Sequence, residues 1–269
     1  MKDKKILYVS SEVIPYLPET EISSMSFEAP RMVNSKKGQI RIFMPRYGNI
    51  NERRHQLHEV IRLSGMNLVI NDMDMPLIIK VASIPKERMQ VYFIDNEEYF
   101  KRKATYADEA GKLFKDNDER AIFFAKGVIE TVKKLNWSPD IIHVHGWLAS
   151  FLPLYLRKHY HKDPLFENSK IVTSLYKKGF EGALNKKVTD KIMFDGIEAE
   201  HLEELKNPDY INLMKLAIKH SDAIILGSEE VPEELHDYLK EFEMPVLKFH
   251  KKEDFSPAYL DFYLSKVLQ

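Results

Sequence analysis

Cysteine is absent from the 269-residue sequence, and glycine is scarce. Without cysteine the chain has no disulfide framework, no thiolate metal ligand and no cysteine nucleophile. Its ten glycines fall below the usual share of about 7%. No two are adjacent and none are spaced Gly-x-Gly, so the dinucleotide-binding fingerprint and the Walker loop are both missing. The chain therefore has no glycine-rich loop with which to hold a phosphate.

An excess of charge of either sign is also missing. Forty basic and forty-one acidic residues give a net charge of -1, which predicts no nucleic-acid or membrane partner. The sequence contains no apolar run of about 18 residues that would span a bilayer. Residues 6–9 are too short for the core of a signal peptide. These features predict a globular cytoplasmic protein.

Apolar runs and their periodicity predict an α/β fold with a doubly wound parallel sheet. From residue 116 onward helices and strands alternate, which is typical of parallel strands with helices on both faces. Strands are predicted at 5–10, 39–44, 141–145, 170–175, 223–226 and 246–249, and helices at 27–36, 116–135, 147–159, 210–220 and 229–241. Gly38 is expected to end the first helix as its left-handed residue.

The stretch from 57 to 95 differs from the rest of the chain. It contains four strand-like runs at short spacing, separated by turn residues, which predicts a β-hairpin or meander excursion on the main sheet. At the other end, Ser256 and Pro257 are typical of a helix start. We expect a domain over 1–255 and a strongly apolar helix over 256–269 that packs on it, or on another chain.

Seven segments together carry a resemblance to a known family. In the same order and with matching gaps, they resemble the N-terminal half of bacterial glycogen and starch synthases. They are 6–15 (ILYVSSEVIP), 44–50 (MPRYGNI), 91–95 (VYFID), 116–120 (DNDER), 139–147 (PDIIHVHGW), 180–182 (FEG) and 221–228 (SDAIILGS).

The resemblance implies the GT-B architecture, in which two doubly wound domains face each other across a cleft. It implies a retaining glucosyltransferase that moves glucose from ADP-glucose to the end of an α-1,4-glucan, without a metal or other cofactor. The donor is held mostly by the C-terminal domain and the acceptor mostly by the N-terminal one. This sequence ends where the second domain would begin, so we expect any such domain on another chain.

The donor loop of the family has no equivalent here. Where the family has Lys-Thr-Gly-Gly-Leu against the phosphates of the nucleotide, this chain has Pro18, Glu19, Thr20, Glu21 and Ile22. The lysine is lost and both glycines carry side chains, so backbone N–H groups cannot approach a phosphate closely. A carboxylate about 4 Å from a phosphate costs roughly 4 kcal/mol at an effective dielectric of about 20. We therefore expect no tight binding of ADP-glucose.

Two other family positions also differ. The family motif His-x-His-Asp-Trp-His corresponds to residues 143–148, where Gly146 replaces the aspartate and Leu148 the last histidine. The family pair His-Asn corresponds to Tyr176 and Lys177. Lys177 also begins a small basic cluster with Lys178, Lys186 and Lys187, which is either a solvated loop or a means of attracting an anion to the cleft.

Several candidate cleft residues lie at strand ends, where ligands bind to such sheets. Glu12 follows the first strand and either lines the cleft or caps a turn. Tyr92 and Trp147 either stack on sugar rings or belong to the core. With Asn117, these residues are predicted to line one acceptor cleft.

Each remaining candidate has either a role in binding or a purely structural role. Asp116, Asn117 and Arg120 open the long helix and either bind the acceptor or stabilise the helix N-terminus. His143 and His145 share one strand face, as cleft residues or as hydrogen-bonded core residues. They would hold a metal only with a third ligand, and none is identifiable.

Three kinds of function remain open. The chain is a glucosyltransferase, whole or as half of a split pair. Alternatively, it is a pseudoenzyme that keeps an α-glucan groove. The third alternative is an interaction or regulatory protein that docks on a true synthase through its C-terminal helix.

Overall fold

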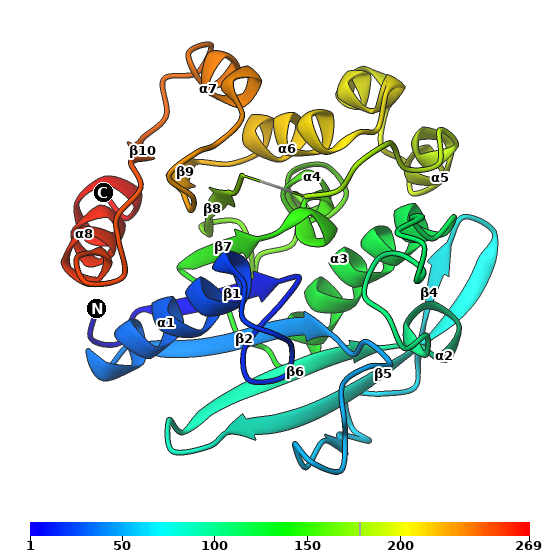
Figure 1. The fold of residues 1–269 in the computed structure, drawn as a ribbon, viewed down its shortest axis with the longest axis horizontal. Helices are drawn as coiled ribbons and strands as arrows, with labels where there is room; N and C mark the ends of the chain where they lie inside the picture. The colour runs from blue at the N-terminus through cyan, green and yellow to red at the C-terminus, as the bar shows by residue number, and fades with distance from the viewer. Residues whose placement is uncertain (178) are drawn as a thin grey trace.

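A single mostly parallel sheet organises the computed structural model, which describes residues 1–177 and 179–269 (Figure 1). Lys178 of the predicted basic cluster lies outside the described residues. The strand order is β10-β9-β8-β7-β1-β2-β6-β5-β3, and β4 pairs with β5. The strands are β1 Lys5–Ser10, β2 Gln39–Pro45, β3 His58–Glu59, β4 Met66–Ile70, β5 Met73–Ile84, β6 Met89–Asp95, β7 Ile141–His145, β8 Lys170–Leu175, β9 Ala223–Leu226 and β10 Val246–Leu247.

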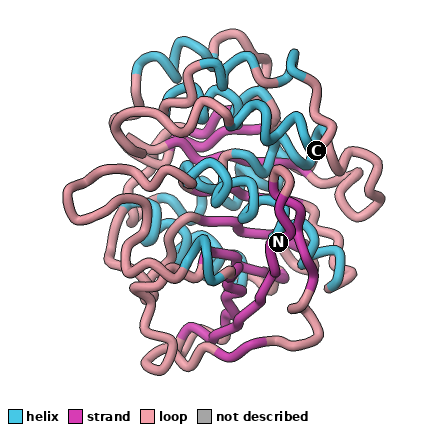
Figure 2. Tube along the Cα trace, turned by 90° about the vertical axis from the view of Figure 1, so that its right-hand side faces the viewer, coloured by secondary structure: helices cyan, strands magenta, loops and turns pink. Residues whose placement is uncertain are grey.

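Helices cover both faces of this sheet, as predicted for a doubly wound fold (Figures 1 and 2). Helix α1 packs on β1 and β2 beside α8, while α3, α4 and α6 form a second layer. The helices are α1 Glu21–Ser35, α2 Glu97–Phe100, α3 Asn117–Lys134, α4 Phe151–Lys158, α5 Val188–Phe194, α6 Tyr210–Lys219, α7 Glu233–Leu239 and α8 Phe255–Phe262. No described helix has the length and apolarity needed to cross a membrane.

The switch point of the sheet lies between β1 and β7. From β1 the chain moves through β2 to β6 on one side, then returns to β7 and continues through β8 to β9 on the other. Because the connections run in opposite directions there, the loops after β1 and β7 separate and leave room for a ligand. The predicted excursion is also present, since β3, β4 and β5 pair antiparallel while β6 joins β2 in parallel.

Helix α1 begins at Glu21, six residues before the predicted start at residue 27. A capping box explains the difference: the hydroxyl of Thr20 accepts the N–H of Ser23, and the hydroxyl of Ser23 accepts the N–H of Thr20. Two orphan N–H groups are thereby satisfied, which stabilises a helical turn in a segment whose polar composition is typical of a loop.

Replacing this cap tests its contribution to stability. We expect Thr20→Ala to lower the free energy of unfolding by about 1 kcal/mol, because the N–H of Ser23 loses its acceptor. Urea denaturation measures the change. The matched control is Ser24→Ala on the same turn, whose hydroxyl bonds Glu19 rather than a helix N–H. Equal losses from the two variants would contradict a capping role for Thr20.

The end of α1 also differs from the prediction. Lys37, with φ 61°, is the left-handed residue, and Gly38 follows it without a positive φ. Glycine is needed at position 38 for space instead, because a Cβ there would lie 2.4 Å from Cγ1 of Val33.

The predicted helices over 147–159 and 256–269 are present, but their first residues or their helix types differ from the prediction. Helix α8 begins at Phe255 after Asp254, and Ser256 makes no capping bond. It continues into a π-helical turn at Tyr263–Val267. The predicted helix over 147–159 is a 3-10 turn at Trp147–Ala149 followed by α4.

Candidate functional site

A cavity of about 360 Å³ opens at the carboxyl ends of β1, β7 and β8, beside the switch point. Its walls come from the loop after β1, the N-terminus of α1, the loop that precedes α3, and the residues that follow β7 and β8. The lining residues are Glu12, Thr20, Glu21, Ile22, Tyr106, Trp147, Tyr176, Lys177 and Gly179.

Glu12 is held with both carboxylate oxygens engaged. Oε2 accepts a hydrogen bond from the hydroxyl of Thr20 at 2.7 Å, and Oε1 accepts one from Tyr106 at 3.1 Å. The backbone N–H of Glu12 donates to the hydroxyl of Ser10. The carboxylate therefore binds side-chain hydroxyl groups at the cavity wall, and it caps no described backbone turn.

The other charged groups of the cavity do not neutralise Glu12. Glu21 accepts a hydrogen bond from the hydroxyl of Ser228 at 2.5 Å, and that hydroxyl accepts the backbone N–H of Lys177. The ammonium of Lys177 is paired with Glu230 outside the cavity. Among the described lining residues, two carboxylates thus face one ammonium that already has an acidic partner.

Aromatic side chains form the remaining wall. The ring of Trp147 lies 4.9 Å from that of Tyr106 and 4.8 Å from that of Phe180, centroid to centroid. Trp147 is buried, and its indole N–H has no hydrogen-bond partner among the described residues. Of the two predicted alternatives, stacking on sugar rings or belonging to the core, the burial of Trp147 favours the core.

Gly146, which stands where the family motif has aspartate, lies close to Ser11. Its φ is +80°, and a Cβ at this position would lie 2.4 Å from the hydroxyl oxygen of Ser11. That hydroxyl accepts the N–H of Leu148 and joins the end of β7 to β1. An aspartate at position 146 would therefore require Ser11 to shift and would hold a left-handed backbone conformation that favours glycine.

Tyr92 and Asn117 lie outside the cavity, so the predicted cleft of Glu12, Tyr92, Asn117 and Trp147 is wrong in two of its four members. The hydroxyl of Tyr92 accepts a hydrogen bond from Arg41, and its ring stacks on Phe43. A residue in the middle of β6 does not reach the strand ends.

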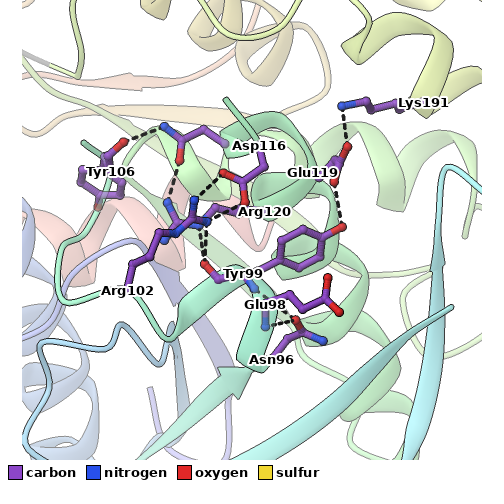
Figure 3. A network of polar contacts seen from close by, with 10 residues as sticks. Asn96, Glu98, Tyr99, Arg102, Tyr106, Asp116, Glu119, Arg120 and Lys191 are labelled. Carbon is purple, nitrogen blue, oxygen red and sulfur yellow. Dashed lines mark hydrogen bonds and ion pairs between the residues drawn. The ribbon is translucent and has the colours of Figure 1, made fainter. Parts of the chain in front are cut away.

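Asp116, Asn117 and Arg120 are not among the lining residues of the cavity. Figure 3 shows Asp116 and Arg120 in a polar network with Arg102 and Tyr99. Asp116 pairs with both terminal nitrogens of Arg102, and as the N-cap residue of α3 it makes no side-chain capping bond. Arg120, fully buried, donates to the carbonyl of Tyr99 and to Asn117. The Asn117 amide in turn donates to the carbonyl of Tyr106 at 2.8 Å. This network fixes the loop that presents Tyr106 to Glu12.

His143 and His145 are core residues in this structure. Nδ1 and Nε2 of His143 lie 2.6 and 2.8 Å from the hydroxyls of Tyr263 and Ser174, and Nδ1 of His145 lies 2.7 Å from that of Tyr176. Burial lowers the pKa of His145 to about 3 and that of His143 well below its usual value. Three of the four ring nitrogens are occupied by hydroxyl groups, which leaves the pair no set of atoms for a metal.

Sequence reasoning did not propose Tyr106 and Gly179, which line the cavity, or Ser228 and Glu230, which contact its lining residues. Ser228 and Glu230 follow β9, so their position after a strand was the available signal. Tyr106 lies in an irregular loop with no periodicity, and only its contact with Glu12 identifies it.

Fold and cavity together define a doubly wound α/β domain with a cavity at its switch point. The family described as the starch synthase catalytic domain matches residues 5–245. Glycogen synthase of Chlorobaculum parvum is 36% identical over 232 residues, which are 84% of this chain and 46% of that protein. Glycogen synthase of Chlorobium luteolum is 34% identical over 238 residues, 88% of this chain and 48% of that protein. The chain belongs to the starch synthase catalytic domain family.

A solved structure shows the same fold. The catalytic domain of starch synthase IV from Arabidopsis thaliana, bound to ADP and acarbose, superposes with a TM-score of 0.73 at 16% sequence identity. The match covers 92% of this chain and 51% of that one. The chain thus spans about half the length of the synthases that it matches.

Proposed function

We propose that this domain serves glycogen or starch synthesis by holding an α-glucan at the switch-point cavity, and that this cavity does not take the diphosphate of ADP-glucose. In this proposal the chain does not transfer glucose by itself. The observation that carries the proposal is the pair of carboxylates, Glu12 and Glu21, in a cavity whose one described lysine is paired elsewhere.

The chemistry of the wall favours a neutral polyhydroxy ligand. Glu12 accepts two hydroxyl hydrogen bonds and Glu21 accepts one, so both carboxylates already make the contact that a sugar hydroxyl would offer. The ring of Tyr106, backed by the buried Trp147, adds the apolar surface that a sugar ring packs against. The relatives are glycogen synthases, and acarbose in the related structure is an oligosaccharide.

The same wall disfavours the binding of a diphosphate. The N-terminus of α1 would attract an anion through its free N–H groups and its dipole. Here Thr20 caps it, and Glu21 stands as its first residue, so this position already carries a negative charge. Each carboxylate about 4 Å from a phosphate would cost roughly 4 kcal/mol, which is about a thousandfold in affinity.

Calorimetry tests both parts of this proposal. We expect maltoheptaose to bind with a dissociation constant in the millimolar range or tighter, and ADP-glucose to show no submillimolar binding. Glu12→Gln should weaken maltoheptaose binding about fivefold, because a neutral amide is a weaker acceptor than a carboxylate. The control is Glu59→Gln, an exposed residue on the distant strand β3. Submillimolar binding of ADP-glucose would overturn the proposed exclusion of the diphosphate.

Family membership supports a second candidate, a glucosyltransferase that transfers glucose through this domain. Incubating the chain alone with ADP-glucose and glycogen separates the two. We expect no incorporation of labelled glucose, and measurable incorporation would establish an active enzyme instead of a pseudoenzyme.

A further inference from the structure

A buried polar network runs from the wall of the cavity to the C-terminal helix. Tyr176 lines the cavity, and its hydroxyl lies 2.7 Å from Nδ1 of His145. The rings of His145 and His143 pack with their centroids 4.0 Å apart. Nδ1 of His143 lies 2.6 Å from the hydroxyl of Tyr263, which follows α8. A residue at the end of the chain is thereby connected to the ligand site through three side chains.

Each member of this network has little freedom to move. Tyr176 is 2% exposed, and His143, His145 and Tyr263 are fully buried. His143 has hydroxyl partners at both ring nitrogens, with Ser174 as the second. A neutral imidazole has one N–H and one acceptor nitrogen, so the two hydroxyls must play opposite roles. Loss of either partner leaves a buried nitrogen unpaired, which favours a new ring orientation.

The C-terminal helix changes from α-helical to π-helical geometry at Tyr263. Helix α8 ends at Phe262, and a π-helical turn begins at Tyr263. π-Helical turns are rare in proteins, and many of those that occur lie at functional sites. Here the wider turn starts at the residue whose hydroxyl bonds His143.

We propose that Tyr263 is a positioning residue for the cavity. Its hydroxyl orients His143, the packed ring of His145 transmits that orientation, and His145 holds the hydroxyl of Tyr176, a residue of the cavity wall. Docking of the C-terminal helix is then coupled to glucan affinity, so that the docked state binds more tightly. The affinity part of this inference rests on the glucan binding proposed above.

Removal of the hydroxyl alone tests the coupling. Tyr263→Phe is expected to weaken maltoheptaose binding about fivefold, and Tyr176→Phe by a similar factor. The double variant should bind no more weakly than either single one, because both break the same connection. Ser265→Ala is the control: it removes a hydroxyl from the same C-terminal segment, and that hydroxyl donates to the carbonyl of Asp261 rather than to a member of the network. Its affinity should stay within twofold of the wild type.

A second readout does not depend on any ligand. In the ligand-free protein, the imidazole nitrogen NMR signals of His145 should shift in Tyr263→Phe and remain unchanged in Ser265→Ala. If Tyr263→Phe fails to fold, Tyr176→Phe gives the reverse test, read at the signals of His143. Unchanged histidine signals, or losses of affinity that add in the double variant, would overturn the inference. Shifted signals in a protein that binds no maltoheptaose would support it and refute the proposed function instead.

Discussion

Lowering the pH from 7 to 5 is expected to reduce the free energy of unfolding by about 2 kcal/mol for each of His145 and His220. Burial lowers the pKa of both side chains to about 3, and nearby Lys158 and Lys219 contribute at His220. In the unfolded chain both histidines have pKa values near 6.5. His143 acts in the same direction, because burial lowers its pKa as well.

The free energy of unfolding falls with pH because the unfolded chain takes up protons that the folded protein does not. Between pH 6.5 and pH 3 the unfolded chain binds a proton on each of these histidines and the folded protein does not, so stability falls as the pH falls. Above about pH 6.5 these histidines are neutral in both states and cause no loss of stability. Urea denaturation at pH 7, 6 and 5 measures the change in the free energy of unfolding.

Substituting one histidine separates its contribution to the pH dependence of stability from the contributions of carboxylates, which also titrate. His220→Gln should reduce the loss between pH 7 and pH 5 by about 2 kcal/mol relative to the wild type. The exposed His58, changed to Gln, is the control and should leave the loss unchanged. A wild-type pH dependence retained in His220→Gln would show that this side chain is already protonated in the fold or accessible to water.

Removal of residues 256–269 is expected to make the protein insoluble, or to lower its unfolding free energy by more than about 5 kcal/mol. The segment places the side chains of Tyr259, Phe262, Tyr263 and Val267 in the core, and each contributes roughly 1.5–3 kcal/mol on burial. Their removal also uncovers His143, which would lose its hydroxyl partner Tyr263. Thermal unfolding and the soluble fraction on expression measure the effect.

Single substitutions on the same segment supply the control. Tyr263→Ala should cost about 3–5 kcal/mol because it opens a cavity beside His143, whereas Leu264→Ala, at a side chain that is 44% exposed, should cost less than about 1 kcal/mol. A truncated chain that keeps its melting temperature and changes only its oligomeric state would show that the helix docks on another chain. The division of the chain at residue 255 remains a prediction until that experiment.

Predictions from the sequence succeeded where a local pattern determines the structure. The bounds of β1, β7, β8 and β9 match the predicted strands, because buried parallel strands are continuous runs of apolar residues. The alternation of helices with these strands was sufficient for the doubly wound sheet, and the seven motifs were sufficient for the family. Errors at helix ends arose where one capping contact, such as that of Thr20, outweighs composition.

The sequence by itself therefore determined the fold class, the family and the edge of the sheet where a ligand site would lie. Only the tertiary structure decided which side chains meet there. Glu12 and Tyr106 are 94 residues apart and His143 and Tyr263 are 120 apart. No periodicity connects positions so distant, because their contact depends on how loops and the last helix pack on the completed sheet. For the same reason Tyr92 is a plausible cleft residue by sequence, and only packing against Arg41 and Phe43 shows that it is not one.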